Sequence, residues 1–199
     1  MNKSIQKYIR ENFSIITKIA IIYAIGIIIG IILFMFTDIK NDYANIVKGV
    51  LDNTKLDNFQ GINIISNGIK NNIIYIVALY FSLITIITPL IICFLVVLKA
   101  IVTGIYICTI FSIFGTLKGL AVNIISVIIP VGFSLVGYII ICTNIISIFK
   151  CISQGEKINL KSSIIHLYYL LISISLISFS IVIEQLMTSV TINIYNSIL

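Results

Sequence analysis

Few side chains in this sequence could do chemistry, and they do not form a recognisable catalytic or metal-binding set. The 199 residues include a single histidine, His166, and four cysteines. A zinc peptidase would need an HExxH motif and an α/β-hydrolase a GxSxG motif, and neither occurs. No pair of aspartates falls within an apolar run. We therefore expect no enzyme activity, no catalytic or metal-ligating residues and no cofactor.

The cysteines and the histidine are predicted to be structural. No two cysteines have the CxxC spacing of metal and redox sites, and three of the four lie inside apolar runs. Small buried hydrophobic side chains are the ordinary role of such cysteines. His166 begins an apolar run, where a lone histidine indicates a structural contact. The four cysteines are Cys93, Cys108, Cys142 and Cys151.

Other polar side chains lie deep inside the last part of the longest apolar stretch. In lipid, such groups face neighbouring helices and hydrogen-bond there, so we favour packing over a conduction path. No Asp or Glu occurs within Ile73–Phe149. Because coupled transporters use intramembrane acids, this absence argues against one. The polar residues are Asn123, Ser126, Ser134, Thr143 and Asn144.

The elements that must position these groups are apolar blocks about as long as a bilayer is thick. Hydrophobic residues make up 59% of the chain and charged residues 10%, against about 45–50% and about 25% in soluble domains. Hydrocarbon cannot hydrogen-bond to the backbone, so only helices or closed barrels span it. The runs are continuous rather than alternating, which predicts helices.

We predict an all-α integral membrane bundle of about five transmembrane helices, forming one domain over residues 1–199. A helix rises about 1.5 Å per residue and a hydrocarbon core is about 30 Å thick. The stretch Ile73–Phe149 is too long for one crossing and must turn back twice. The predicted spans are 15–36, 73–98, 100–115, 120–149 and 164–183.

Charged residues and prolines predict where these spans turn, end or bend. We place the two turns at Lys99 and at Thr116–Gly119, because Lys99 and Lys118 each interrupt an otherwise uncharged run. Glu184 and Gln185 close the fifth span, and the tail 186–199 either extends it as a helix or lies along the membrane interface. Pro89 and Pro130 are expected kink sites, because proline removes an intrahelical hydrogen bond.

The distribution of positive charge predicts the orientation. With the N-terminus inside, the inner segments carry eight lysines and arginines and the outer segments five. This obeys the positive-inside rule, so we predict N-in and C-out, with segment 37–72 outside the cytoplasm. The net charge of +6 does not indicate nucleic-acid binding, because the lysines form no basic stripe.

Two patterns predict contacts with other helices or proteins. Gly26 and Gly30 form a GxxxG motif, which lets helices approach closely, either within the chain or in a homo-oligomer. Within segment 37–72, apolar residues recur at helical spacing over about 38–52 and predict a short amphipathic helix. Its face either packs on the membrane or bundle, or docks an extracytoplasmic partner. The face consists of Tyr43, Ile46, Val47, Val50 and Leu51.

Three short motifs follow one another along the chain. They are Ile9-Arg10-Glu11-Asn12 before a glycine-containing span, Pro89 through Leu98-Lys99-Ala100 to Gly104, and Lys118-Gly119 leading through Ser126 to Pro130. Together with the size, the five spans and the polar segment after the first span, they resemble the stage II sporulation protein M family of endospore-forming bacteria. Two positions depart from the pattern: Ala100 replaces a family glycine, and Val131 stands where wider relatives have His.

The resemblance implies a non-enzymatic scaffold, required for engulfment during sporulation, in the septal membrane on the mother-cell side. It also implies that two peptidoglycan-degrading partners, sporulation proteins D and P, are recruited on the outer face of the cell membrane. A small permease or the membrane subunit of an exporter is the alternative, because such proteins share the same helix periodicity.

Overall fold

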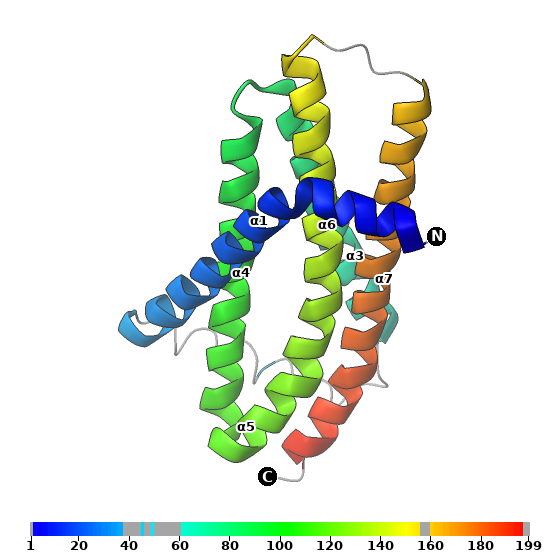
Figure 1. The fold of residues 1–199 in the computed structure, drawn as a ribbon. Helices are drawn as coiled ribbons and strands as arrows, with labels where there is room; N and C mark the ends of the chain where they lie inside the picture. Colours follow the sequence, from blue (N-terminus) through cyan, green and yellow to red (C-terminus); the bar gives the residue numbers. More distant parts are fainter. Residues whose placement is uncertain (1, 38–44, 46–48, 50–60, 156–159, 197–199) are drawn as a thin grey trace.

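The computed structural model is helical along the chain it describes, which is every residue except 1, 38–44, 46–48, 50–60, 156–159 and 197–199 (Figure 1). A short 3₁₀ helix, η1 (Ser82–Ile84), follows α3, and a π-helical segment, η2 (Ile124–Ile128), joins α5 to α6. The α-helices are α1 (Asn2–Phe36), α3 (Gly61–Phe81), α4 (Thr88–Phe114), α5 (Thr116–Asn123), α6 (Ile129–Ser153) and α7 (Leu160–Asn196).

Among the described residues, four helical segments are long and apolar enough to cross a membrane. A shorter apolar helix covers Ile69–Ile84. Large apolar side chains such as Phe36, Leu90 and Phe94 point outward, 82%, 68% and 61% exposed, as expected for helices that face lipid. The all-α fold, with helices long and apolar enough to cross a membrane, is confirmed for the described residues. The count of five spans and the orientation stay predictions. The four segments are Arg10–Phe36, Thr88–Phe114, Thr116–Ser153 and Ile164–Met187.

Figure 1 shows α4, α6 and α7 running along the length of the molecule, with α1 crossing them obliquely. α1 packs mainly on α4, and α7 packs mainly on α6 and also contacts α3. The helices share a main apolar core, and a smaller apolar cluster lies where α4, α5 and η2 meet. The fully buried members of the main core include Leu79, Ile92, Ala100, Ile141 and Ile145.

The α1–α4 crossing is built from glycines. A Cβ added at Gly30 would overlap the backbone carbonyl of Ile101, and one added at Gly104 would overlap the carbonyl of Ile27. A Cβ at Gly26 would lie 2.5 Å from that of Ala100. Only the absence of these side chains lets the two backbones touch. The GxxxG face therefore packs on α4 of the same chain.

The predicted turn at Lys99 is wrong, because α4 runs through it without a break. The chain instead reverses between Ser82 and Ile87. Leucine, lysine and alanine around position 99 are all strong helix formers, whereas the residue before a proline avoids helical geometry. Pro89 occupies the first turn of α4, where its missing N–H costs nothing, so it starts a helix rather than kinking one.

The second turn lies at Gly115, directly before the predicted Thr116–Gly119 turn. The chain turns at Gly115, whose φ of 74° is unfavourable for residues with a Cβ, and Lys118 lies within the following α5. From there α5, η2 and α6 continue as one helical stretch. Pro130 lies in the first turn of α6, directly after the π-helical segment. A π-turn at this point accommodates the hydrogen bond that proline removes.

The tail after Glu184 extends the last helix, which is the first of the two arrangements that the sequence allows. α7 continues through Glu184 to Asn196. Its extension is held against the bundle by a hydrogen bond between the Ser126 and Thr191 hydroxyls, 2.6 Å apart. Glu184 is consequently a side chain inside a long helix rather than a residue at a helix end.

Candidate functional site

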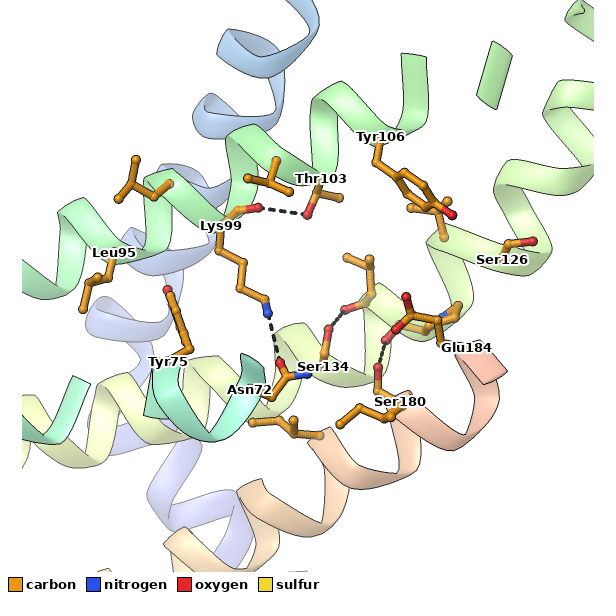
Figure 2. Close-up of a pocket in the computed structure, with 17 residues that line it drawn as sticks. Asn72, Tyr75, Leu95, Lys99, Thr103, Tyr106, Ser126, Ser134, Ser180 and Glu184 are labelled. Atoms are coloured by element: carbon orange, nitrogen blue, oxygen red, sulfur yellow. Dashed lines mark hydrogen bonds between the residues drawn. The ribbon is translucent and has the colours of Figure 1, made fainter. Parts of the chain in front are cut away.

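A cavity of about 610 Å³ lies between α3, α4, α6 and α7 (Figure 2). Much of its wall is apolar, with Leu95, Val102 and Ile177 among the lining residues. Ligand sites in proteins have volumes of about 300–1,000 Å³ and combine apolar walls with a few polar groups. The polar groups here include one lysine, Lys99, and one glutamate, Glu184.

Lys99 connects three helices through its ammonium group. Its Nζ donates to Asn72 Oδ1 of α3 at 3.0 Å and to the Tyr138 hydroxyl of α6 at 2.8 Å. Tyr138 in turn donates to Asn72 Oδ1. The Nζ also lies 4.4 Å and 5.2 Å from the ring centres of Tyr138 and Tyr75, within the range of cation–π attraction. These contacts compensate a charge placed inside an apolar helix.

The aromatic and hydroxyl groups beside Lys99 are themselves held in place. The rings of Tyr75 and Tyr138 meet edge to face, with centres 5.0 Å apart and planes at 79°. The Thr103 hydroxyl donates to the Lys99 carbonyl at 3.0 Å and also lies 3.1 Å from the Tyr23 hydroxyl of α1. The α1–α4 crossing therefore supports the wall from which Lys99 extends.

Glu184 extends into the cavity from α7, across from Lys99 (Figure 2). Ser134 lies between the two charged groups in this view. Near Glu184, Ser180 donates to the Pro130 carbonyl at 2.7 Å and so joins α7 to α6. Opposite charges that share a site of low dielectric constant stabilise each other strongly. An ionisable residue within a membrane span is by default a candidate functional residue.

Lys99 lies near the middle of α4. The helix runs from Thr88 to Phe114, so Lys99 lies about 17 Å from its start and about 23 Å from its end at 1.5 Å per residue. A hydrocarbon core is about 30 Å thick. Lys99 therefore lies well inside a helix that is long and apolar enough to cross a membrane.

A second polar cluster joins α6 to α3 and α7. Asn144 Nδ2 donates to the His166 carbonyl at 3.1 Å and to the Tyr80 hydroxyl at 3.4 Å. His166 Nδ1 hydrogen-bonds to Asn144 Oδ1, which assigns the proton to Nδ1 because an amide oxygen only accepts. Asn123 Nδ2 donates to the Ile107 carbonyl at 3.2 Å. The predicted packing role of the two asparagines is confirmed.

No protein-family model, curated protein or solved structure matches the chain. The family resemblance therefore stands on the short motifs given above.

The remaining predicted site residues lie away from the cavity. Gly26 and Gly30 are at the α1–α4 crossing. The four cysteines are unbridged, with Cys142 buried and the other three half-buried. Within the described residues, no group of three or more His, Cys, Asp or Glu side chains could hold a metal ion. The proposed docking face lies outside the described residues: Tyr43, Ile46, Val47, Val50 and Leu51.

Sequence reasoning missed the cavity because it interpreted Lys99 and Glu184 as markers of span ends. Two signals were available. Leu98 and Ala100 beside Lys99 are helix formers rather than turn residues, which argues against a turn. Beyond Glu184, apolar residues continue at helical spacing through Val190 and Ile194, which favours a helix that does not end there.

Proposed function

We propose that this chain is a non-enzymatic membrane scaffold of the stage II sporulation protein M type, required for engulfment during sporulation. In this proposal it lies in the septal membrane on the mother-cell side, with five spans and an N-in, C-out orientation. The short apolar helix Ile69–Ile84 is the fifth span. The scaffold recruits sporulation proteins D and P, which degrade peptidoglycan outside the membrane.

The observation that best supports this proposal is that the motif residues occupy the positions that organise the bundle. Lys99 joins three helices, and Gly104 forms the backbone contact with α1. Pro89 and Pro130 begin α4 and α6, and the Pro130 carbonyl accepts the bond from Ser180. Two proteins with the same arrangement of helices would be expected to share the residues that position those helices.

The docking surface in this proposal is the amphipathic face within segment 37–72. The segment is tethered to the bundle at both ends, because α1 ends at Phe36 and α3 begins at Gly61. A tethered extracytoplasmic segment could present partners at a fixed position on the membrane. The face is the one formed by Tyr43, Ile46, Val47, Val50 and Leu51.

Deletion of the coding sequence in the source bacterium tests the function. We expect sporulating cells to form the asymmetric septum but to show no thinning of septal peptidoglycan and no membrane migration around the forespore. Electron microscopy and a membrane dye measure the two steps. Complementation with the intact sequence should restore both, and normal engulfment in the deletion strain would overturn the proposal.

A small permease, or the membrane subunit of an exporter, is the second candidate, and the charged cavity is the observation that favours it. Transporters hold substrates near the bilayer midplane, and Lys99, near the middle of α4, lines the same cavity as Glu184. Solute uptake by proteoliposomes containing the purified protein, together with normal engulfment in the deletion strain, would favour the permease over the scaffold.

A further inference from the structure

We propose that the cavity between α3, α4, α6 and α7 binds a zwitterion that carries an anionic group and a primary ammonium. The anionic group faces Lys99 and the ammonium faces Glu184. This inference does not rest on the scaffold role, because it follows from the groups that line the cavity.

The charges of the cavity select a zwitterion. Lys99 and Glu184 bring one positive and one negative charge to different walls of the same cavity (Figure 2). A ligand with a net charge would leave that charge uncompensated in a medium of low dielectric constant, which is costly. A ligand with separated charges of both signs can match each wall while the sum stays zero.

The hydrogen-bonding capacity of Lys99 and Glu184 also favours a zwitterionic ligand. An ammonium has three donors, and the described contacts of Lys99 direct two of them to Asn72 and Tyr138. The third can be donated to an anionic group in the cavity. A carboxylate such as that of Glu184 accepts at about four lone-pair positions, so it can receive an ammonium in addition to neighbouring donors.

The size of the cavity limits the ligand to a small solute or a lipid headgroup. The volume of about 610 Å³ lies within the range of about 300–1,000 Å³ that is usual for sites of small ligands. An amino acid or a phosphoethanolamine group fits this space. The hydroxyls of Thr103, Ser134 and Tyr106 also line it and can solvate a polar ligand.

Binding to the purified, detergent-solubilised protein tests the proposal by native mass spectrometry with three probes. Phosphatidylethanolamine has the required zwitterion, phosphatidylglycerol has the same tails but a net negative charge, and glycerophosphoethanolamine has the zwitterion without tails. We expect phosphatidylethanolamine to bind at least tenfold more tightly than phosphatidylglycerol. Binding of glycerophosphoethanolamine at similar strength would identify a free solute as a sufficient ligand, and binding of the lipid alone would identify a headgroup.

Two pairs of variants locate the site. Glu184→Gln and Lys99→Met should each weaken phosphatidylethanolamine binding at least tenfold. The matched controls Glu11→Gln and Lys118→Met, at exposed positions outside the cavity, should leave it unchanged. Lys99→Met also removes bonds to two helices, so the near-isosteric Glu184→Gln decides the outcome. Equal binding of the two lipids, no binding of any probe, or unchanged binding in Glu184→Gln would overturn the proposal.

Discussion

Lys99 shows how a single charged residue is retained in the middle of an apolar helix. A lysine at the centre of a membrane helix costs about 2.5–3.5 kcal/mol on insertion scales. Here the cost is offset by two hydrogen bonds, two aromatic rings and the opposite charge of Glu184 in the same cavity. The residue therefore stabilises the bundle only while its partners remain in place.

Replacing Lys99 by methionine should destabilise the protein by about 1.5–3 kcal/mol, the range for hydrogen bonds to charged groups. The loss has two causes: the bonds to Asn72 and Tyr138 disappear, and Glu184 loses the opposite charge in its cavity. Unfolding by denaturing detergent in mixed micelles measures it. Lys118→Met, at an exposed position, is the matched control and should change the free energy of unfolding by less than about 0.5 kcal/mol.

The double variant Lys99→Met with Glu184→Gln separates these two causes. If the charges interact, the double variant is more stable than the sum of the single effects predicts. Strictly additive effects would show that the two side chains do not interact across the cavity.

Among the individual residues, the environment of Asn123 and Asn144 could be predicted from the sequence, and that of Lys99 and Glu184 could not. Asn123 and Asn144 lie in an apolar run without charges, where contact with another helix is the only favourable arrangement. A lone charge in an apolar run has the same appearance at a turn and inside a helix. The helix formers on either side of Lys99 favour a helix, but its partners come from three other helices and cannot be identified from the neighbouring sequence.

The α1–α4 crossing is the contact between elements that tolerates substitution least. Apolar burial contributes little between helices in lipid, so close packing decides their association. The contact is made by backbone atoms at Gly30 and Gly104, and a backbone carbonyl cannot move aside as a flexible side chain can. α1 therefore depends on these glycines for its position.

Gly30→Leu should separate α1 from α4, because the added side chain would overlap the Ile101 carbonyl. We expect a loss of about 1–3 kcal/mol, the usual cost of overpacking, seen as a lower melting temperature in detergent and faster proteolysis. Gly132→Leu is the matched control, because nothing lies within 4 Å of a Cβ there. Equal melting temperatures and equal rates of proteolysis for Gly30→Leu and Gly132→Leu would contradict a close α1–α4 contact at Gly30.

The sequence predicts a helix end correctly where the charged or polar residues lie at the point where the chain turns. The first span ends at Phe36 as predicted, because a polar segment follows at once. Between Ile73 and Phe149 the lysines predict turns at Lys99 and at Thr116–Gly119, but the chain turns just before Pro89 and at Gly115. The structure shows that proline and glycine, which act on the backbone directly, determine these turns.

For the whole molecule, moving Lys99 from a turn into α4 preserves the charge bias that predicts orientation. The inner segments then carry seven positive residues and the outer segments five. The positive-inside rule still favours N-in and C-out. In that orientation the turn between α3 and α4, Ser82–Ile87, faces the cytoplasm.

A cysteine at Ile86 tests the turn and the orientation together. Ile86 is 91% exposed, so in a background without the four native cysteines we expect Ile86→Cys to react with a membrane-impermeant maleimide. Labelling should occur in inverted vesicles but not in intact spheroplasts. Phe94→Cys, within α4, should stay unlabelled in both. Labelling of Ile86→Cys in intact spheroplasts would show that the orientation is opposite to the predicted one.

Recruitment of partners is the central claim for the whole molecule, and co-purification from sporulating cells measures it most directly. We expect sporulation proteins D and P to be retained on the tagged intact protein. They should be lost from Val47→Asp and Leu51→Asp, while both variants remain inserted in the membrane. Absence of the two hydrolases from the intact protein, or their undiminished recovery with both variants, would contradict the proposed docking scaffold.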